Sequence, residues 1–386
     1  MKIFYDHQIF SYQTYGGISR YFFELMNQFQ QLRGPDFQLA LKYSDNVYLK
    51  SLKGAAVEQL PSVLKPGSKL RFLATYLLNK RLSSRSLRRG DFDVFHPTFF
   101  DPSFLSLLKG RPFVVTLHDM TPEIFPVLFP RYGLYGRLVT GRWIEGMRLL
   151  AERASNVIAV SENTKSDAVK YYGIDPSRVT VIHHGSSLDP LAYAEVKGVD
   201  MARPFLLFVG GRSGYKNFQF LVRALIPLME WDRDLRVVCI GGGNFSGDET
   251  KQLEDLQVRD KYLQFSATDA ELATLYRAAR AFVFPSRYEG FGIPIIEAFS
   301  CGCPCAISRS SCFPEIAGGA AAYFDPDNLE SMTETLRQVL YDDGLRRKLI
   351  ADGFERAKLF SWEKTATQTL TVYKGACAGR PMGAWS

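Results

Sequence analysis

Two glutamates in the C-terminal half of the chain are the first candidates for chemistry. Glu289 and Glu297 are eight residues apart in the stretch PSRYEGFGIPIIEAFSCGC, and a Gly-Phe-Gly turn follows the first of them. Glycine lets a backbone approach a ligand closely, and the first turn of a following helix offers N–H groups to an anion. On a fully helical path the two carboxylates would be about 12 Å apart along the axis. Either both are solvated surface charges, or they bracket an extended ligand with an anionic centre, such as a nucleotide-sugar.

A glycine loop with two cations supplies the charge that such a ligand needs. The stretch GRSGYKN follows the apolar run FLLFVG and contains Arg212 and Lys216. Arginine can bind two phosphate oxygens as a fork, and lysine can neutralise one as a point charge. Both could be ordinary surface charges, but their place in a strand-to-helix turn favours a diphosphate site. Glu289 would then accept hydroxyls of the sugar, and Glu297 those of the ribose.

The elements that position these residues alternate between short β-rich runs and amphipathic segments. KIFYDH, DVFHP, FVVTLHD, NVIAVSE and VTVIHHG come first, and FLLFVGG, LRVVCIGGG, YLQFSA, AFVFPS, CPCAIS and AAYF follow after a gap. This alternation predicts open parallel sheets with right-handed crossovers, in which ligands bind beyond the carboxyl ends of the strands. We therefore expect an α/β protein with two doubly wound, Rossmann-like domains that face each other across a cleft.

Chain length favours the same number of domains. The chain has 386 residues, which is more than one ordinary core holds. The irregular stretch SSLDPLAYAEVKGVDMARP reads as a linker between the two sets of strands. We expect domains over residues 1–187 and 188–360, with a helix over 361–376 that packs back on the first domain.

Composition indicates an ordinary globular protein. Apolar residues make up 46% of the chain and charged residues 23%. No run of 18 apolar residues is present, so we expect no transmembrane helix, and MKIFYDHQIF has no pattern of a secretory signal. Six cysteines without a disulfide framework fit a reduced, cytoplasmic setting.

Three short patterns resemble metal-binding or phosphate-binding motifs, and we expect each of them to have a structural role instead. Cys301, Cys303 and Cys305 alternate by two, which suits an extended strand with small apolar sulfurs on one face, whereas zinc sites usually use C-x-x-C pairs. The D-x-D patterns at 91–93 and 325–327 lie before a strand and in a proline turn. GGGNFSG after the run LRVVCI lacks a phosphate-binding lysine and reads as a turn. The sequence therefore predicts no metal.

The net charge of +7 is concentrated in one stretch. Between Leu60 and Gly90 there is no acid, and there are eight basic residues: Lys65, Lys69, Arg71, Lys80, Arg81, Arg85, Arg88 and Arg89. Apolar residues at 70, 73, 77 and at 72, 76 are expected to share a stripe on a helix. The stretch 65–89 is either a helix that lies on an anionic membrane surface or a solvated basic face over a core stripe. No recognised module supports a nucleic-acid partner.

The motifs, taken in order, resemble those of retaining glycosyltransferases of family 4, which have the GT-B fold. The pattern P-S-x-x-E-G-F-G-I-P-x-x-E-A-x-x-x-G-x-P is similar to the family signature. YGGISRY at 15–21, TLHD, VSENTK, HHG, VGGRSGYKN and FPEIAGGAAAYF are similar to the family's other motifs. The resemblance covers nearly the whole chain, and the ordered set is more specific than two glutamates alone.

The resemblance implies roles for individual residues. His118 would lie near the transferred sugar, and Glu289 would contact its hydroxyls. The family often has Asn where this chain has His184, so we interpret His184 as structural. The donor would be bound by Gly16 and Gly17 at its phosphate, by Arg212 and Lys216 at the diphosphate, by backbone groups of Phe291, Gly292 and Ile293, by Glu297 at the ribose, and by the segment ending at Thr268 at the base.

The resemblance also implies a reaction. A hexose would move with retention from a nucleotide diphosphate sugar, expected to be GDP-mannose, to a glycan or lipid-linked acceptor in cell-surface polysaccharide synthesis. The transfer would need no metal and no other cofactor, and the enzyme would be cytoplasmic or peripheral at the inner face of the plasma membrane. Two other readings stay open: a catalytically silent sugar- or membrane-binding protein, and a nucleotide-sugar epimerase.

Overall fold

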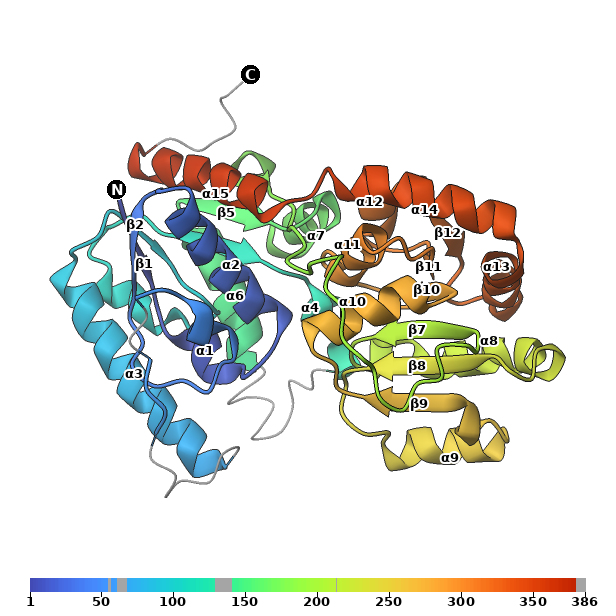
Figure 1. Ribbon diagram of the computed structural model, residues 1–386. Helices are drawn as coiled ribbons and strands as arrows, with labels where there is room; N and C mark the ends of the chain where they lie inside the picture. The colour runs from blue at the N-terminus through green and yellow to red at the C-terminus, as the bar shows by residue number, and fades with distance from the viewer. Residues whose placement is uncertain (55–56, 61–67, 129–140, 213, 380–386) are drawn as a thin grey trace. The chain divides into compact units, whose positions relative to one another are not determined.

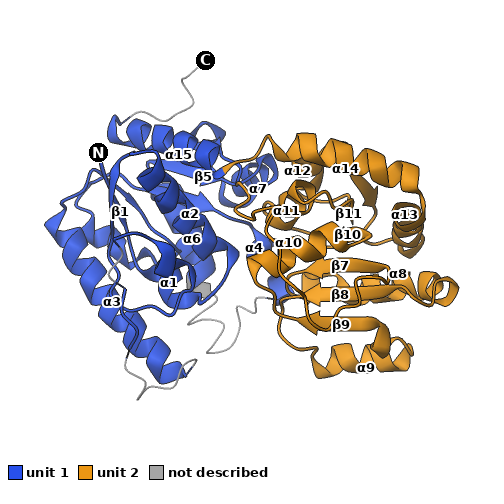
Figure 2. Cartoon of the chain, in the orientation of Figure 1, with its two compact units in different colours: residues 1–184, 362–386 blue, residues 185–361 orange. Residues whose placement is uncertain are grey.

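The computed structural model describes residues 1–54, 57–60, 68–128, 141–212 and 214–379 (Figure 1). The chain divides into two compact units, unit 1 with residues 1–184 and 362–386 and unit 2 with residues 185–361 (Figure 2). The boundary expected after residue 187 falls after His184. The C-terminal helix α15 (Trp362–Cys377) belongs to unit 1, where it packs on α2 (Gly17–Gln31) and on strands of that unit.

The described part of unit 1 contains six short parallel strands. Their order is β2-β1-β3 in one ladder and β4-β5-β6 in another. A parallel bridge between Phe95 and Phe113 connects the two ladders. The strands are β1 (Lys2–Tyr5), β2 (Asp36–Leu39), β3 (Val94–His96), β4 (Val114–Leu117), β5 (Asn156–Ala159) and β6 (Val179–Val181). Strands β1, β3, β4 and β5 are almost wholly buried, as the continuous apolar runs predicted.

Helices of unit 1 begin and end at residues suited to these positions. Ser68 and Ser161 each accept a backbone N–H at the start of a helix, and Gly90 and Gly173 end the same two helices in the left-handed region. Besides α2 and α15, the α-helices are α1 (Gln8–Tyr12), α3 (Lys69–Arg89), α4 (Thr121–Ile124), α6 (Gly141–Arg153) and α7 (Glu162–Tyr172). The short 3-10 helices are η1 (Tyr48–Ser51), η2 (Pro102–Leu107), η3 (Pro126–Leu128) and η5 (Pro176–Arg178).

Unit 2 holds one six-stranded parallel sheet in the order β12-β11-β10-β7-β8-β9. Its strands are β7 (Phe205–Val209), β8 (Arg236–Ile240), β9 (Tyr262–Phe265), β10 (Ala281–Phe284), β11 (Cys305–Ser308) and β12 (Ala321–Phe324). The chain runs outward from β7 to β9, then returns to the other side of β7 and continues to β12. Strands β7 and β10 therefore flank the point where the order reverses, which is where open α/β sheets bind ligands.

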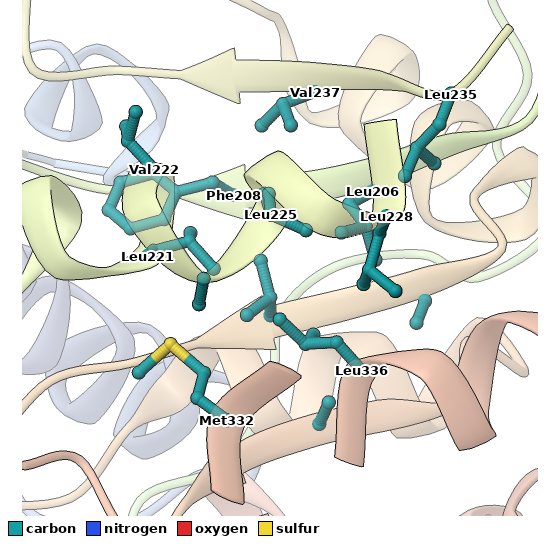
Figure 3. Close-up of a cluster of buried hydrophobic side chains, with 14 of the residues drawn as sticks. Leu206, Phe208, Leu221, Val222, Leu225, Leu228, Leu235, Val237, Met332 and Leu336 are labelled. Carbon is teal, nitrogen blue, oxygen red and sulfur yellow. The ribbon is translucent and has the colours of Figure 1, made fainter. Parts of the chain in front are cut away.

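The core of unit 2 fixes the ends of these strands. In Figure 3, side chains of α8 and α13 converge with those of β7 and β8, among them Leu225, Leu336 and Phe208. The helices of this unit are α8 (Phe218–Trp231), α9 (Gly247–Asp255), α10 (Asp269–Ala278), α11 (Ile293–Ser300), α12 (Phe313–Ala317), α13 (Leu329–Tyr341) and α14 (Asp343–Ala357), with 3-10 turns η6 (Gly214–Lys216) and η7 (Arg259–Lys261). Burial of so many branched side chains makes the sheet a rigid support for the loops at its edge.

Helix α3 turns polar side chains inward. Asn79 accepts the backbone N–H groups of Lys42 and Tyr43 and donates to the Tyr43 carbonyl, while Ser83 donates to the Ala40 carbonyl. The segment after β2 is irregular, so its backbone groups need partners, and the inner face of α3 supplies them. The buried residues of this face are Arg71, Thr75, Asn79, Ser83 and Leu87.

The apolar positions of α3 do not form the single stripe that the sequence predicted. Leu70, Leu73 and Leu77 face outward and are 63%, 50% and 50% exposed. Phe72, which is 43% exposed, and the half-buried Tyr76 lie beside the ring of Tyr12, with ring centroids 5.7 and 5.5 Å away. Because these leucines are exposed, a solvated basic face over an apolar core stripe does not describe this helix.

Candidate active site

The loops after β7 and β10 meet at the switch point of the unit 2 sheet. Lys216 lies in η6, soon after β7, and Glu289 lies between β10 and α11. The Arg287 N–H donates to the Tyr215 carbonyl at 2.8 Å, which connects the two loops directly. Residues that are far apart in the sequence are thus held at one edge of the sheet.

Lys216 and Glu289 form an ion pair. The distance from Lys216 Nζ to Glu289 Oε1 is 2.6 Å, and both side chains are partly buried. The sequence assigned them to different parts of one ligand, the diphosphate and the sugar, and the structure brings them into direct contact. A charge-assisted pair at the carboxyl ends of adjacent strands can bind an anion through the lysine and hydroxyls through the carboxylate.

The turn after Glu289 fixes this carboxylate beside a helix start. The Glu289 N–H donates to Ser311 Oγ at 3.1 Å, and Gly292 precedes α11 with φ at 92°, a left-handed conformation that favours glycine. The separation of about 12 Å, which holds only for a fully helical path, does not apply, because α11 begins at Ile293, after the expected glycine turn. Phe291 is buried, and its carbonyl accepts from the Cys312 thiol.

Glu297 lies on the inner side of α11. It is 3% exposed, and Tyr276 Oη donates to its Oε2 at 3.4 Å. Burial, together with the nearby Glu297 carboxylate, holds the pKa of Tyr276 well above its usual value, so this phenol stays a hydrogen-bond donor. Glu289 thus contacts a cation, and Glu297 contacts a phenol that stays neutral.

Arg212 supports a loop of the protein. Its Nε donates to Glu249 Oε1 at 3.0 Å, and its Nη atoms donate to carbonyls of the turn 241–244, at 2.8 Å from both Gly241 and Gly243. The side chain is 2% exposed. This arrangement differs from the expectation that Arg212 forks onto a diphosphate, because its donors already hold the turn that follows β8. Lys216 is the better placed cation.

Thr268 has a structural task that the sequence did not reveal. Its Oγ1 accepts the Glu271 N–H, and the Glu271 carboxylate accepts the Thr268 N–H at 2.8 Å, which together form a capping box at the start of α10. Thr268 follows β9, at the end of the sheet farthest from β12. A contact of this residue with a base stays a prediction.

In unit 1, Gly16 and Gly17 lie at the start of α2. The Gln13 side chain covers this helix end, because its Oε1 accepts the Ser19 N–H at 3.1 Å. A Cβ atom at Gly16 would lie 2.5 Å from the same oxygen, whereas one at Gly17 would meet nothing within 4 Å. Gln13 thus takes the place that an anion would take at this helix end, and no sequence pattern indicated this contact.

His118 follows β4 directly and is buried. Its ring lies edge-on to Tyr21, with centroids 5.0 Å apart, and its Nε2 has no hydrogen-bond partner among the residues that the structure describes. Burial lowers the pKa of His118 to about 3, so the imidazole is neutral at physiological pH. A neutral imidazole whose Nε2 has no partner can form a hydrogen bond with a sugar hydroxyl, as donor or acceptor according to its tautomer.

A chain of buried hydrogen bonds lies behind Tyr21, and the sequence did not predict it. Tyr21 Oη lies 3.2 Å from Thr116 Oγ1, and His96 bridges Thr116 to Tyr373 of α15 with distances of 3.0 and 2.6 Å. These groups come from α2, β4, β3 and α15, and they fix the ring against which His118 rests. His184 stacks on Trp362 with centroids 5.5 Å apart, which fits its interpretation as a structural residue.

The patterns that invited a metal have structural partners. Lys2 binds Asp91 and Asp93 through its side chain and backbone N–H, and Asp327 accepts from Arg287. The cysteines at 301, 303 and 305 are buried, but the strand begins only at the third of them, so the expected extended run is too long. Within the described part of the chain, no group of three or more His, Cys, Asp or Glu side chains is placed to hold a metal ion.

None of the helices in the described ranges combines the length and the hydropathy that crossing a bilayer requires.

Comparisons with known proteins identify the family of the chain. Residues 15–189 match the model of Glycosyltransferase Family 4, and residues 192–356 match that of Glycosyl transferases group 1. The chain is 28% identical over 404 residues to O-antigen chain mannosyltransferase B of Escherichia coli, covering 97% of this chain and 100% of that protein. It is 30% identical over 320 residues to D-inositol 3-phosphate glycosyltransferase of Xylanimonas cellulosilytica, covering 76% and 74%.

A solved glycosyltransferase structure shares the fold. The structure of WaaG, a glycosyltransferase involved in lipopolysaccharide biosynthesis, superposes with a TM-score of 0.72 at 18% identity, covering 97% of this chain and 100% of that one. Family, fold and catalytic class therefore agree: the chain belongs to the family 4 glycosyltransferases and has their GT-B fold.

Proposed function

We propose that this glycosyltransferase moves mannose from GDP-mannose to a hydroxyl of a growing cell-surface polysaccharide, with retention at the anomeric carbon. The observation that carries the proposal is the ion pair of Lys216 and Glu289, at the carboxyl ends of the two strands that flank the switch point. Mannose and a polysaccharide acceptor are supported by the 28% identity to the O-antigen mannosyltransferase over nearly the full length of both proteins.

Donor binding would exchange the partners of this ion pair. The diphosphate competes for the ammonium of Lys216 and gains further donors from the N-terminus of α11. Glu289 then loses its cation and accepts hydroxyls of the transferred sugar. Glu297 holds the ribose hydroxyls, and Arg212 keeps the turn after β8 in place without touching the donor.

The transfer would proceed by departure and attack on one face of the sugar. The bond between the anomeric carbon and the diphosphate oxygen breaks, and the electron pair stays on the diphosphate, whose charge Lys216 stabilises. The acceptor hydroxyl forms the new bond at the same carbon, and its proton passes to the departing diphosphate. His118 keeps the role that the resemblance implies, as a neutral hydrogen-bonding partner of the sugar.

A ligand screen followed by transfer assays tests this proposal. Thermal unfolding is measured with GDP, UDP, TDP and ADP, because a ligand at 100 times its dissociation constant adds about 2.7 kcal/mol of stability. We expect GDP to stabilise most, GDP-mannose to be turned over, and NMR of the product to show an α linkage. Stabilisation by UDP alone would show that the donor is a UDP-sugar and not GDP-mannose. No stabilisation by any of the four nucleotides would overturn the assignment of a donor site at Lys216 and Glu289.

A further inference from the structure

The outward face of α3 changes character halfway along the helix. Its first half presents leucines, and its second half presents arginines. The exposed leucines are Leu70, Leu73, Leu77 and Leu78, and the exposed arginines are Arg81, Arg85, Arg88 and Arg89. No acidic residue occurs anywhere in α3. Because the helix buries its polar side chains, this apolar surface contributes little to the core, and its exposure to water needs another explanation.

Two ion pairs set which side of α3 faces outward. Arg71 Nη2 lies 2.7 Å from Asp45 Oδ1, and Lys80 Nζ lies 2.8 Å from Asp101 Oδ2. Arg71 and Lys80 therefore face the protein, although the sequence analysis counted them among the eight basic residues that could meet a membrane. Lys65 falls outside the described residues. The outward charge comes from Lys69 and the four arginines.

We infer that the outward face of α3 docks unit 1 onto an anionic lipid bilayer. A helix lying flat on such a membrane places leucines at the boundary of headgroups and acyl chains, and its cations meet anionic headgroups. Each lysine or arginine near an anionic surface contributes about 1 kcal/mol. The inference does not depend on the proposed donor or acceptor, because it concerns a surface of unit 1 alone.

A second copy of the chain fits this face less well than a membrane does. In a parallel pairing of two α3 helices the arginines would meet one another. In an antiparallel pairing the leucines of each helix would meet the arginines of the other. Because α3 has no acid, either pairing leaves the cations without an opposite charge, whereas an anionic bilayer satisfies both halves of the face.

Vesicle sedimentation tests the inference with two α3 variants. Leu73→Gln with Leu77→Gln removes apolar surface, and Arg81→Gln with Arg85→Gln and Arg88→Gln removes charge. We expect the wild type to sediment with vesicles of phosphatidylcholine and phosphatidylglycerol but not with phosphatidylcholine alone, and to be released by salt, which screens the attraction. Each variant should lower the partition coefficient about tenfold or more.

Matched controls are available in unit 2. Arg223→Gln with Lys251→Gln and Arg347→Gln removes the same number of exposed charges, and Leu191→Gln with Leu359→Gln removes the same number of exposed leucines. Both controls should bind vesicles as the wild type does, and thermal unfolding checks that every variant is folded. If the charge control loses as much vesicle binding as the α3 charge variant, net charge alone would explain the binding, and the assignment to α3 would be overturned.

Two further results would also overturn the inference. The first is a wild type that ignores phosphatidylglycerol vesicles at low salt. The second is a concentration-dependent dimer that the leucine variant abolishes, without vesicle binding by the wild type, which would assign the face to a second copy of the chain.

Discussion

In unit 2 the candidate site is charged, whereas in unit 1 it is neutral. Lys216 and Glu289 form an ion pair at the edge of their sheet, and both keep some exposure to water. His118 is buried, and its pKa of about 3 keeps it uncharged. All five histidines of the chain lie in unit 1, and none lies in unit 2.

This difference matches what each ligand group would require. A diphosphate needs a fixed positive charge, which a partly exposed lysine can keep without a large desolvation cost. A sugar hydroxyl needs a hydrogen-bonding partner of fixed orientation, which a buried neutral ring held by Tyr21 can provide. The two units should therefore respond differently to acid, to mutation and to salt.

Acid should destabilise unit 1 far more than unit 2. Burial lowers the pKa of His7, His96 and His118 to about 3, whereas the unfolded chain binds these protons near pH 6.5. Their contribution to stability is complete above pH 6.5 and is lost as the pH falls through the window toward 3. At pH 5 the loss is about 2 kcal/mol for each histidine.

Hydrogen exchange read by mass spectrometry separates the units in this experiment. After correction for the intrinsic exchange rate, peptides of unit 1 should lose protection between pH 7 and pH 5, and peptides of unit 2 should keep theirs. Equal loss in both units would contradict the claim that neutral buried histidines distinguish unit 1.

Replacing Arg212 should affect folding of unit 2 before it affects binding. Arg212→Ala leaves the buried carboxylate of Glu249 without its cation, and removal of one partner of a buried pair costs about 3–5 kcal/mol. The free energy of unfolding in urea measures this loss, with exposed Arg223→Ala as the control. If the Arg212→Ala protein is stable but no longer binds nucleotide, the prediction that Arg212 contacts the diphosphate directly would be supported instead.

Replacing Lys216 should affect binding before folding. Lys216→Ala should weaken nucleoside diphosphate binding by about 1.5–3 kcal/mol, the scale of a charge-assisted hydrogen bond, and should reduce turnover as well. Calorimetric titration measures the affinity, and Lys251→Ala on α9 removes an exposed lysine as a control. Unchanged affinity in the Lys216 variant would contradict the claim that Lys216 is the cation that binds the diphosphate in unit 2.

The smallest expected effect is that of metal removal. In the proposed site Lys216 stabilises the departing diphosphate in place of a divalent ion, so turnover should be the same with and without EDTA. Assays with added manganese and magnesium complete the test. Loss of turnover on chelation that manganese restores would show that the acidic pairs at 91–93 or 325–327 were dismissed wrongly.

Local patterns predicted the elements and the main pair of the site. Alternating β-rich runs and glycine turns identified the strands, and the rule for parallel sheets placed Lys216 and Glu289 at their carboxyl ends. Prediction worked here because each residue follows its strand within a few positions. Their mutual contact required the strand order, which no local pattern specifies.

Contacts between distant segments were beyond the sequence. Arg212 could not be recognised as a supporting residue, because its acceptors lie in the turn 241–244 after another strand. The polar inner face of α3 depends on the irregular segment after β2, which has no period of its own. By contrast, the Gly-Phe-Gly pattern did indicate the turn between Glu289 and α11, in which Gly292 adopts a left-handed conformation.

The most direct test of the account is calorimetric titration of GDP into two isosteric variants, Glu289→Gln and Glu297→Gln, with transfer measured in parallel. Glu289→Gln frees Lys216 from its partner, so GDP affinity should be unchanged or higher while transfer of the sugar falls about 100-fold or more. Glu297→Gln should weaken GDP itself by about tenfold, because a ribose contact is lost. Equal losses of GDP affinity in both variants would contradict the central claim that the two glutamates hold opposite ends of one donor.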